Sequence, residues 1–130
     1  MKAKDLMIGD WVYNPFTRKK LRLTFGRDID LAEGLCLEPI PLTAEILEKN
    51  GFKTEHGFYC DVFSLEESER GSRIVFFPKD GNYTKGGYNY IHAEIGTEYG
   101  CTSIDELPIK YVHELQHALR LCGIEKEIIL

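Results

Sequence analysis

Apolar and polar residues alternate near the start of the chain in a pattern typical of short β-strands. Residues 11–13, Trp-Val-Tyr, have strong strand propensity, and residues 21–25 place three apolar side chains on one face with a period of two. An Asn-Pro pair separates the two segments, and proline cannot donate a hydrogen bond to a neighbouring strand. The pattern predicts a β-hairpin closed by the loop 14–20, with a third strand around residues 35–37. A small curled sheet of this kind can close into an SH3-like barrel, which is a further expectation.

Residues 43–50 are predicted to form a short helix. Thr43 can be its N-cap, because a threonine hydroxyl accepts a backbone N–H of the first turn. Leu42 and Leu47 have the spacing of a hydrophobic staple. Gly51 is suited to the left-handed conformation in which many helices end.

A second β region follows this helix. Strands are predicted at 58–63, 73–77 and 88–95, where apolar and aromatic residues recur. Residues 66–70 are charged and read as a linker, and Asp80-Gly81 is a tight-turn pair.

The last predicted element is an amphipathic helix between Pro108, which suits a first turn, and Gly123, which suits a helix end. At 100° per residue, one stripe of this helix is apolar and is expected to face the core. The stripe consists of Val112, Leu115, Ala118, Leu119 and Cys122. His113 and His117 fall on roughly the opposite side, which predicts an exposed polar face unless the β region covers both faces. The expected architecture is an α+β single domain, 1–130, with this helix packed on the sheet.

Composition narrows the class of protein. The chain has 130 residues, 43% hydrophobic and 28% charged, which is enough to bury a core. Its net charge of −5 repels nucleic-acid backbones and anionic lipid as a whole. No apolar run is long enough for a signal peptide or a membrane span. We therefore expect a soluble cytoplasmic protein with no membrane association and with reduced cysteines. The cysteines are Cys36, Cys60, Cys101 and Cys122, and none forms a C-x-x-C pair.

One motif indicates enzyme chemistry. Residues 113–117, His-Glu-Leu-Gln-His, match H-E-x-x-H, in which two histidines on one helix face bind zinc and the glutamate acts as base toward the metal-bound water. The zinc-peptidase hypothesis assigns His113 and His117 as ligands and Glu114 as the base.

A third zinc ligand is not evident from the sequence. The extended metzincin pattern requires glycine and histidine at the positions of Arg120 and Gly123, and few residues follow for a glutamate on a later helix. A ligand from upstream, such as His56, His92 or a cysteine, stays open. The favoured interpretation is an exposed helix face or partner surface without a metal or other cofactor.

Two further groups of residues are candidates for binding. A basic cluster lies in the predicted hairpin, and its other interpretation is a solvated face. Its residues are Arg18, Lys19, Lys20, Arg22 and Arg27. Tyrosines beside lysines and glycines could stack single-stranded bases, or could pack in strands with their hydroxyls in water. They are Tyr83, Tyr88, Tyr90 and Tyr99.

Three stretches together resemble a family of small uncharacterised proteins from gut Bacteroidetes genomes and their phages or prophages. They are Asp5-Leu6-Met7-Ile8-Gly9-Asp10-Trp11-Val12, then Ile40-Pro41-Leu42-Thr43 with Leu47 and Gly51-Phe52, and Tyr111-Val112-His113-Glu114-Leu115-Gln116. Many members of that family have glutamine at the place of Glu114 and asparagine at the place of His117. The resemblance therefore implies a structural V-H-x-L-Q helix, in which His113 and Gln116 hydrogen-bond to the neighbouring β region.

The leading hypothesis is a non-enzymatic accessory protein of a phage or mobile element that contacts a protein or a nucleic acid. The alternative is a zinc-dependent peptidase that uses residues 113–117. A third hypothesis is a structural or self-associating module. The sequence sets neither the partner nor the oligomeric state.

Overall fold

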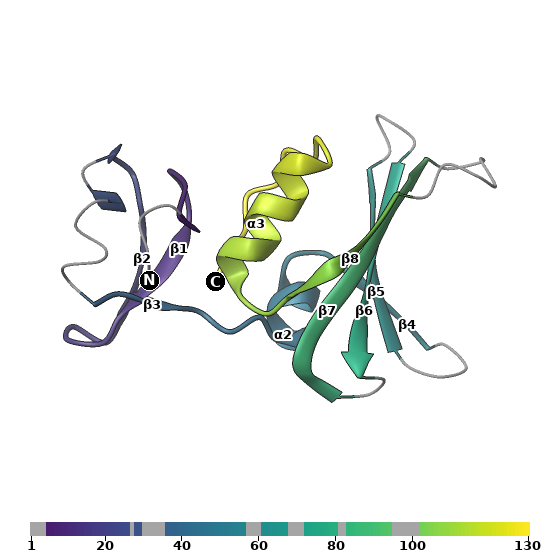
Figure 1. Ribbon diagram of the computed structural model, residues 1–130, viewed down its shortest axis with the longest axis horizontal. Coiled ribbons are helices and arrows are strands. Elements are labelled where there is room, and N and C mark those ends of the chain that lie inside the picture. Colours follow the sequence, from purple (N-terminus) through teal and green to yellow (C-terminus); the bar gives the residue numbers. More distant parts are fainter. Residues whose placement is uncertain are drawn as a thin grey trace.

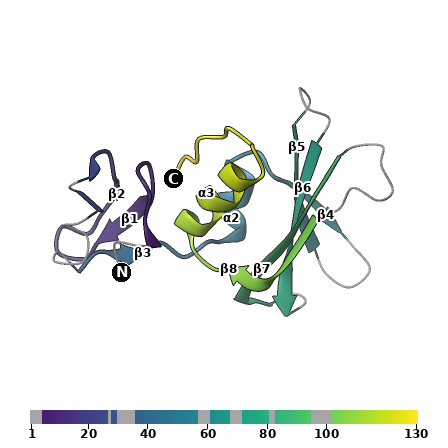
Figure 2. The ribbon, with the colours of Figure 1, turned by 45° about the horizontal axis from the view of Figure 1, so that its top comes forward.

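A computed structural model describes residues 5–26, 28–29, 36–56, 61–67, 72–80, 83–94 and 102–130 of the chain. It contains two antiparallel sheets, and the C-terminal helix α3 lies between them (Figures 1 and 2). This arrangement confirms the expected α+β class. No helix of the described part is long and apolar enough to cross a membrane.

The first sheet has the strand order β2-β1-β3 and contains the expected hairpin. β1 (Trp11–Asn14) pairs antiparallel with β2 (Lys19–Arg22), and its other edge pairs with β3 (Glu38–Pro39). The third strand was expected around 35–37, but β3 begins only at Glu38, and residue 35 lies outside the described residues. The described strands form an open sheet with no closed barrel, so the SH3-like form is not adopted. Strands of two to four residues are too short to close into a barrel.

The short helix α2 (Ala44–Lys49) forms where local signals predict it. The Thr43 hydroxyl accepts a hydrogen bond from the backbone N–H of Ile46 at 3.3 Å. Leu47 is fully buried. Gly51 has φ +86°, the left-handed conformation expected after the helix.

The second sheet has the order β4-β5-β6-β7-β8, and all its pairings are antiparallel. Its strands are β4 (Lys53–His56), β5 (Asp61–Glu67), β6 (Ser72–Asp80), β7 (Tyr83–Glu94) and β8 (Thr102–Ile109).

Three strands of the second sheet correspond to predicted ones, while β4 and β8 were not expected. Residues 66 and 67 of the expected linker belong to β5, so the linker prediction was wrong for them. Residues 58–60, 68–70 and 95 and Gly81 of the expected turn lie outside the described residues. Pro108 belongs to β8 rather than to the start of α3, so that prediction was wrong. An edge strand can accommodate a proline, because one side of its backbone needs no sheet partner.

The main core lies between the two helices, the C-terminal segment and the second sheet. Its buried residues are Ile40, Leu42, Leu47, Phe52, Phe63, Ile74, Phe76, Tyr88, Ile109, Val112, Leu115, Ala118, Leu119, Ile124 and Ile128. A smaller hydrophobic cluster forms at the first sheet, and it consists of Leu6, Val12, Leu23 and Leu37. The predicted apolar stripe of α3 (Val112–Leu121) therefore faces the main core.

The polar side of α3 is covered as well, because the helix also contacts β1 of the first sheet. His113 and Gln116 are only 7% and 6% exposed. The prediction of an exposed polar face is wrong for His113, while the side chain of His117 is 28% exposed. The sequence left one exception open, in which β structure covers both faces of the helix, and the structure has this arrangement.

Candidate functional site

Gln116 connects α3 to the turn that precedes β1. Its Oε1 accepts a hydrogen bond from the backbone N–H of Trp11, and its Nε2 donates to the carbonyl of Gly9, both at 2.9 Å. The side chain therefore satisfies two backbone groups in a buried place. The hydrogen bond to the neighbouring β region that the resemblance implies is present for Gln116.

The next residue of the helix, His117, contacts the buried carboxylate of Asp10. The distance from His117 Nε2 to Asp10 Oδ2 is 2.7 Å, and the Asp10 side chain is 0% exposed. Since a carboxylate only accepts, Nε2 carries the proton of this hydrogen bond. The same Oδ2 accepts from the backbone N–H of Met7 at 2.7 Å, and Arg120 Nη1 lies 3.7 Å from Oδ1. The partner of His117 is thus Asp10, which the sequence showed only as one residue of the first stretch of the resemblance.

His113 is enclosed between α3 and the first sheet. Its ring stacks on Tyr111, with centroids 5.9 Å apart and planes inclined by 10°, and meets His117 edge-on at 5.7 Å. Burial lowers the pKa of His113 below its ordinary value of 6.5, although Glu114, Asp10 and Asp5 oppose this effect. The imidazole is therefore held toward its neutral form. Its Nδ1 has no hydrogen-bond partner among the described residues, so the bond to the β region that the resemblance implies is not observed at this atom.

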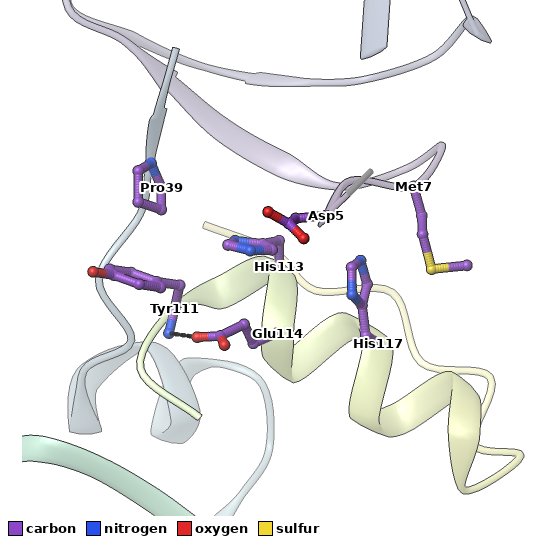
Figure 3. A pocket seen from close by; sticks show the side chains of 7 residues that line it. All are labelled: Asp5, Met7, Pro39, Tyr111, His113, Glu114 and His117. Atoms are coloured by element: carbon purple, nitrogen blue, oxygen red, sulfur yellow. Dashed lines mark hydrogen bonds between the residues drawn. The ribbon is translucent and has the colours of Figure 1, made fainter. Parts of the chain in front are cut away.

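Glu114, the base of the zinc-peptidase hypothesis, helps to begin the helix. Its Oε1 accepts hydrogen bonds from the backbone N–H groups of Lys110 at 3.0 Å and Tyr111 at 3.1 Å. Figure 3 shows the carboxylate turned toward the Tyr111 nitrogen while His113 and His117 project to another side. A glutamate at the third position of a helix commonly accepts the backbone N–H at the helix start in this way, which stabilises the first turn.

The H-E-x-x-H motif lacks the surroundings of a zinc centre in the part of the chain described. No group of three or more His, Cys, Asp or Glu side chains there is arranged to hold a metal ion. His117 Nε2 is already bonded to Asp10. His56 and His92 were the possible third ligands from earlier in the chain, and the structure does not describe their side chains.

The two histidines line an open pocket of about 580 Å³ beside the start of α3 (Figure 3). Its lining residues are Asp5, Met7, Pro39, Tyr111, His113, Glu114 and His117. The residues come from the segment before β1, from β3 and from α3, so the pocket exists only when the helix and the first sheet are assembled.

The basic cluster divides into two parts. Arg22 forms an ion pair with Glu127 and lies 5.7 Å from the centre of the Trp11 ring, so its cation helps to hold the C-terminal segment. Arg27 lies outside the described residues. Arg18, Lys19 and Lys20 are exposed, and within the described structure no ion pair engages them.

An exposed phenylalanine lies beside these three cations. Phe16 is 79% exposed, the largest value among the exposed large hydrophobic side chains of the described part. Asn14 Oδ1 accepts from the backbone N–H groups of Phe16 at 3.0 Å and Thr17 at 3.3 Å, which orders the loop. We call Phe16, Arg18, Lys19 and Lys20 the hairpin tip. Sequence reasoning missed Phe16, although an aromatic residue between a proline and a basic run in a turn was a visible signal.

The tyrosine-rich region does not present Tyr88 to solvent. Tyr88 is fully buried, and its ring meets Phe63 edge-on at 6.0 Å. Burial raises the pKa of its phenol above 10.0. The packing interpretation is confirmed for this residue, and its assignment as a binding residue is wrong. The side chains of Tyr83 and Tyr90, and all of Tyr99, lie outside what the structure describes.

Comparisons of the chain with protein-family models, with curated proteins and with solved structures give no match.

Proposed function

We propose that this chain is a non-enzymatic accessory protein of a phage or other mobile element, and that it binds a partner through the hairpin tip. The observation that carries this proposal is the 79% exposure of Phe16 beside three cations without counter-charges among the described residues. A phenyl ring in water forgoes the roughly 1.5–3 kcal/mol that its burial yields. Its position on an ordered loop therefore favours a contact with a partner.

Of the two expected partner classes, single-stranded nucleic acid fits the hairpin tip better. Aromatic rings stack on unpaired bases, while neighbouring lysines and arginines contact the phosphates. The cations lie on one hairpin of a protein whose net charge is −5. We therefore expect local binding that weakens strongly as salt rises.

The H-E-x-x-H motif agrees with a non-enzymatic protein, because its side chains make contacts that stabilise the fold. Glu114 caps the start of α3, and His117 bonds to Asp10. These contacts support a structural role for the motif. Metal analysis of protein purified without chelator, beside His117→Ala, tests this point. Near one zinc per chain, lost in the variant, would overturn the non-enzymatic assignment.

The binding proposal is tested by fluorescence anisotropy with a labelled single-stranded oligonucleotide of mixed sequence, at about 50 mM and about 200 mM salt. Phe16→Ala should weaken binding about 5- to 150-fold, the range for loss of one stacked base. Lys19→Gln with Lys20→Gln should lower the salt dependence by about two phosphate contacts.

Lys53→Gln is the matched control, because Lys53 is an exposed lysine on the other sheet. It should bind like the wild type. Absence of wild-type binding at the lower salt would exclude nucleic acid as the partner, and an equal loss in the control would show that the hairpin tip is not the contact. A protein partner would then be sought by cross-linking from position 16.

A further inference from the structure

The pocket beside the start of α3 is lined by charges of one sign. Asp5 and Glu114 contribute carboxylates, and no lysine or arginine is among the described residues that line it. Within the described structure neither carboxylate forms an ion pair. Because no lysine or arginine of the described residues pairs with these charges, this part of the protein attracts a cation from solution.

The wall of the pocket is aromatic and contains an unsatisfied polar group. Tyr111 and His113 form a nearly parallel stack there, and Figure 3 shows the imidazole between Tyr111 and Asp5. His113 is only 7% exposed, and its Nδ1 has no hydrogen-bond partner. A buried polar atom without a partner is unfavourable by about 1–3 kcal/mol. A ligand N–H that reaches this wall would remove that deficit.

We infer that this pocket binds an organic ammonium group, that is, a protonated alkylamine. Carboxylates accept the N–H bonds of an ammonium ion, and aromatic faces attract its charge. An anion would meet two carboxylates. A metal ion bound by the two histidines would compete with Asp10 for His117 Nε2. The volume of about 580 Å³ lies in the usual range for small-ligand sites.

The ammonium group has two possible sources, a free polyamine or the lysine side chain of a peptide, and the experiment separates them. Isothermal titration calorimetry is performed with spermidine and, in a second arm, with N-acetyl-lysine methylamide. The wild type should bind at least one probe saturably at one site per chain. Tighter binding of spermidine identifies a free amine as the ligand, and tighter binding of the lysine amide identifies a side chain.

Two variants test the carboxylates without disturbing the fold. Asp5 is exposed, so Asp5→Asn changes only charge. Glu114→Gln keeps a side-chain oxygen for the helix N-terminus, because glutamine also serves at this position. Each should weaken binding about tenfold or more, as expected for loss of a charge-assisted hydrogen bond.

Glu125→Gln is the control for net charge, since Glu125 lines a different pocket beside the C-terminal segment. It should bind as the wild type does. Absence of saturable binding, or an equal loss in the control, would overturn the inference. The His113 ring resonances should shift when the probe is added to the wild type, and unchanged resonances would place the amine elsewhere. The inference is independent of the hairpin tip, so Phe16→Ala should bind the probe normally.

Discussion

Asp10 and His117, 107 residues apart in the chain, meet at 2.7 Å, and the carboxylate of Asp10 is completely enclosed. The contact joins the turn before β1 to the second half of α3. Gln116 makes the neighbouring connection to Gly9 and Trp11. Together these polar contacts hold the first sheet against a helix whose apolar side already belongs to the main core.

Asp10→Asn should therefore destabilise the protein by about 2 kcal/mol, because it removes the charged acceptor shared by His117 and the Met7 backbone. Urea unfolding followed by circular dichroism measures the change. Glu127→Gln is the control, since the Arg22–Glu127 pair lies at the surface and is expected to contribute less than about 1 kcal/mol. Equal effects of the two variants would contradict a special role for Asp10.

Gln116→Leu should be destabilising by about 2–4 kcal/mol. Leucine is similar in size, but it leaves the partly buried N–H of Trp11 and carbonyl of Gly9 without their partners. Leu121→Gln on the same helix, at a side chain that is 73% exposed, should change stability by no more than about 0.5 kcal/mol. Thermal unfolding of both variants measures the change in stability. A small loss of stability for Gln116→Leu would mean that water replaces the amide.

Sequence reasoning succeeded where the signals are local. α2 was predicted from Thr43, Leu47 and Gly51, and each occupies the expected position. The apolar stripe of α3 was also correct, because periodicity identifies which side of a helix is apolar. Periodicity does not reveal whether a second sheet covers the polar side, which is why the exposure of His113 was predicted wrongly.

Two strands, β4 and β8, and the partner of His117 were not predicted from the sequence, and the reason is the same in each case. β4 (Lys53–His56) is entirely polar, and β8 (Thr102–Ile109) contains acidic residues and a proline, so neither has the composition of a strand. Their pairing is set by the neighbouring strands. Likewise, the motif containing His117 was visible, but its partner Asp10 is distant in sequence, and only the assembled fold brings the two together.

Gly87→Ala should lower the stability of the protein more than a glycine-to-alanine substitution at an open position. Gly87 has φ +85°, and a Cβ added there would lie 2.7 Å from the carbonyl oxygen of Ile109 on the neighbouring strand. The left-handed conformation alone disfavours alanine by about 1–2 kcal/mol, and the contact adds to this. Urea unfolding should show a loss of at least about 2 kcal/mol. Gly26→Ala, with nothing within 4 Å of the added Cβ, should be nearly neutral.

The stability of the protein should fall as the pH falls below 6.5, because of His113. Burial lowers the pKa of this imidazole in the folded state. Between the lowered pKa and 6.5 the unfolded chain binds a proton that the folded chain does not, so the free energy of unfolding rises with pH in this window. The charged groups that face the ring, Glu114, Asp10 and Asp5, reduce the effect without reversing it, while His117 strengthens it.

Urea unfolding at a series of pH values from about 7 to about 5 measures this dependence. His113→Phe keeps an aromatic ring against Tyr111 and removes the titrating group, so its stability should change less over the same range. Because the difference between the two curves isolates the imidazole, the contributions of other histidines cancel. Curves of equal slope would mean that His113 takes up its proton as readily in the folded protein as in the unfolded chain.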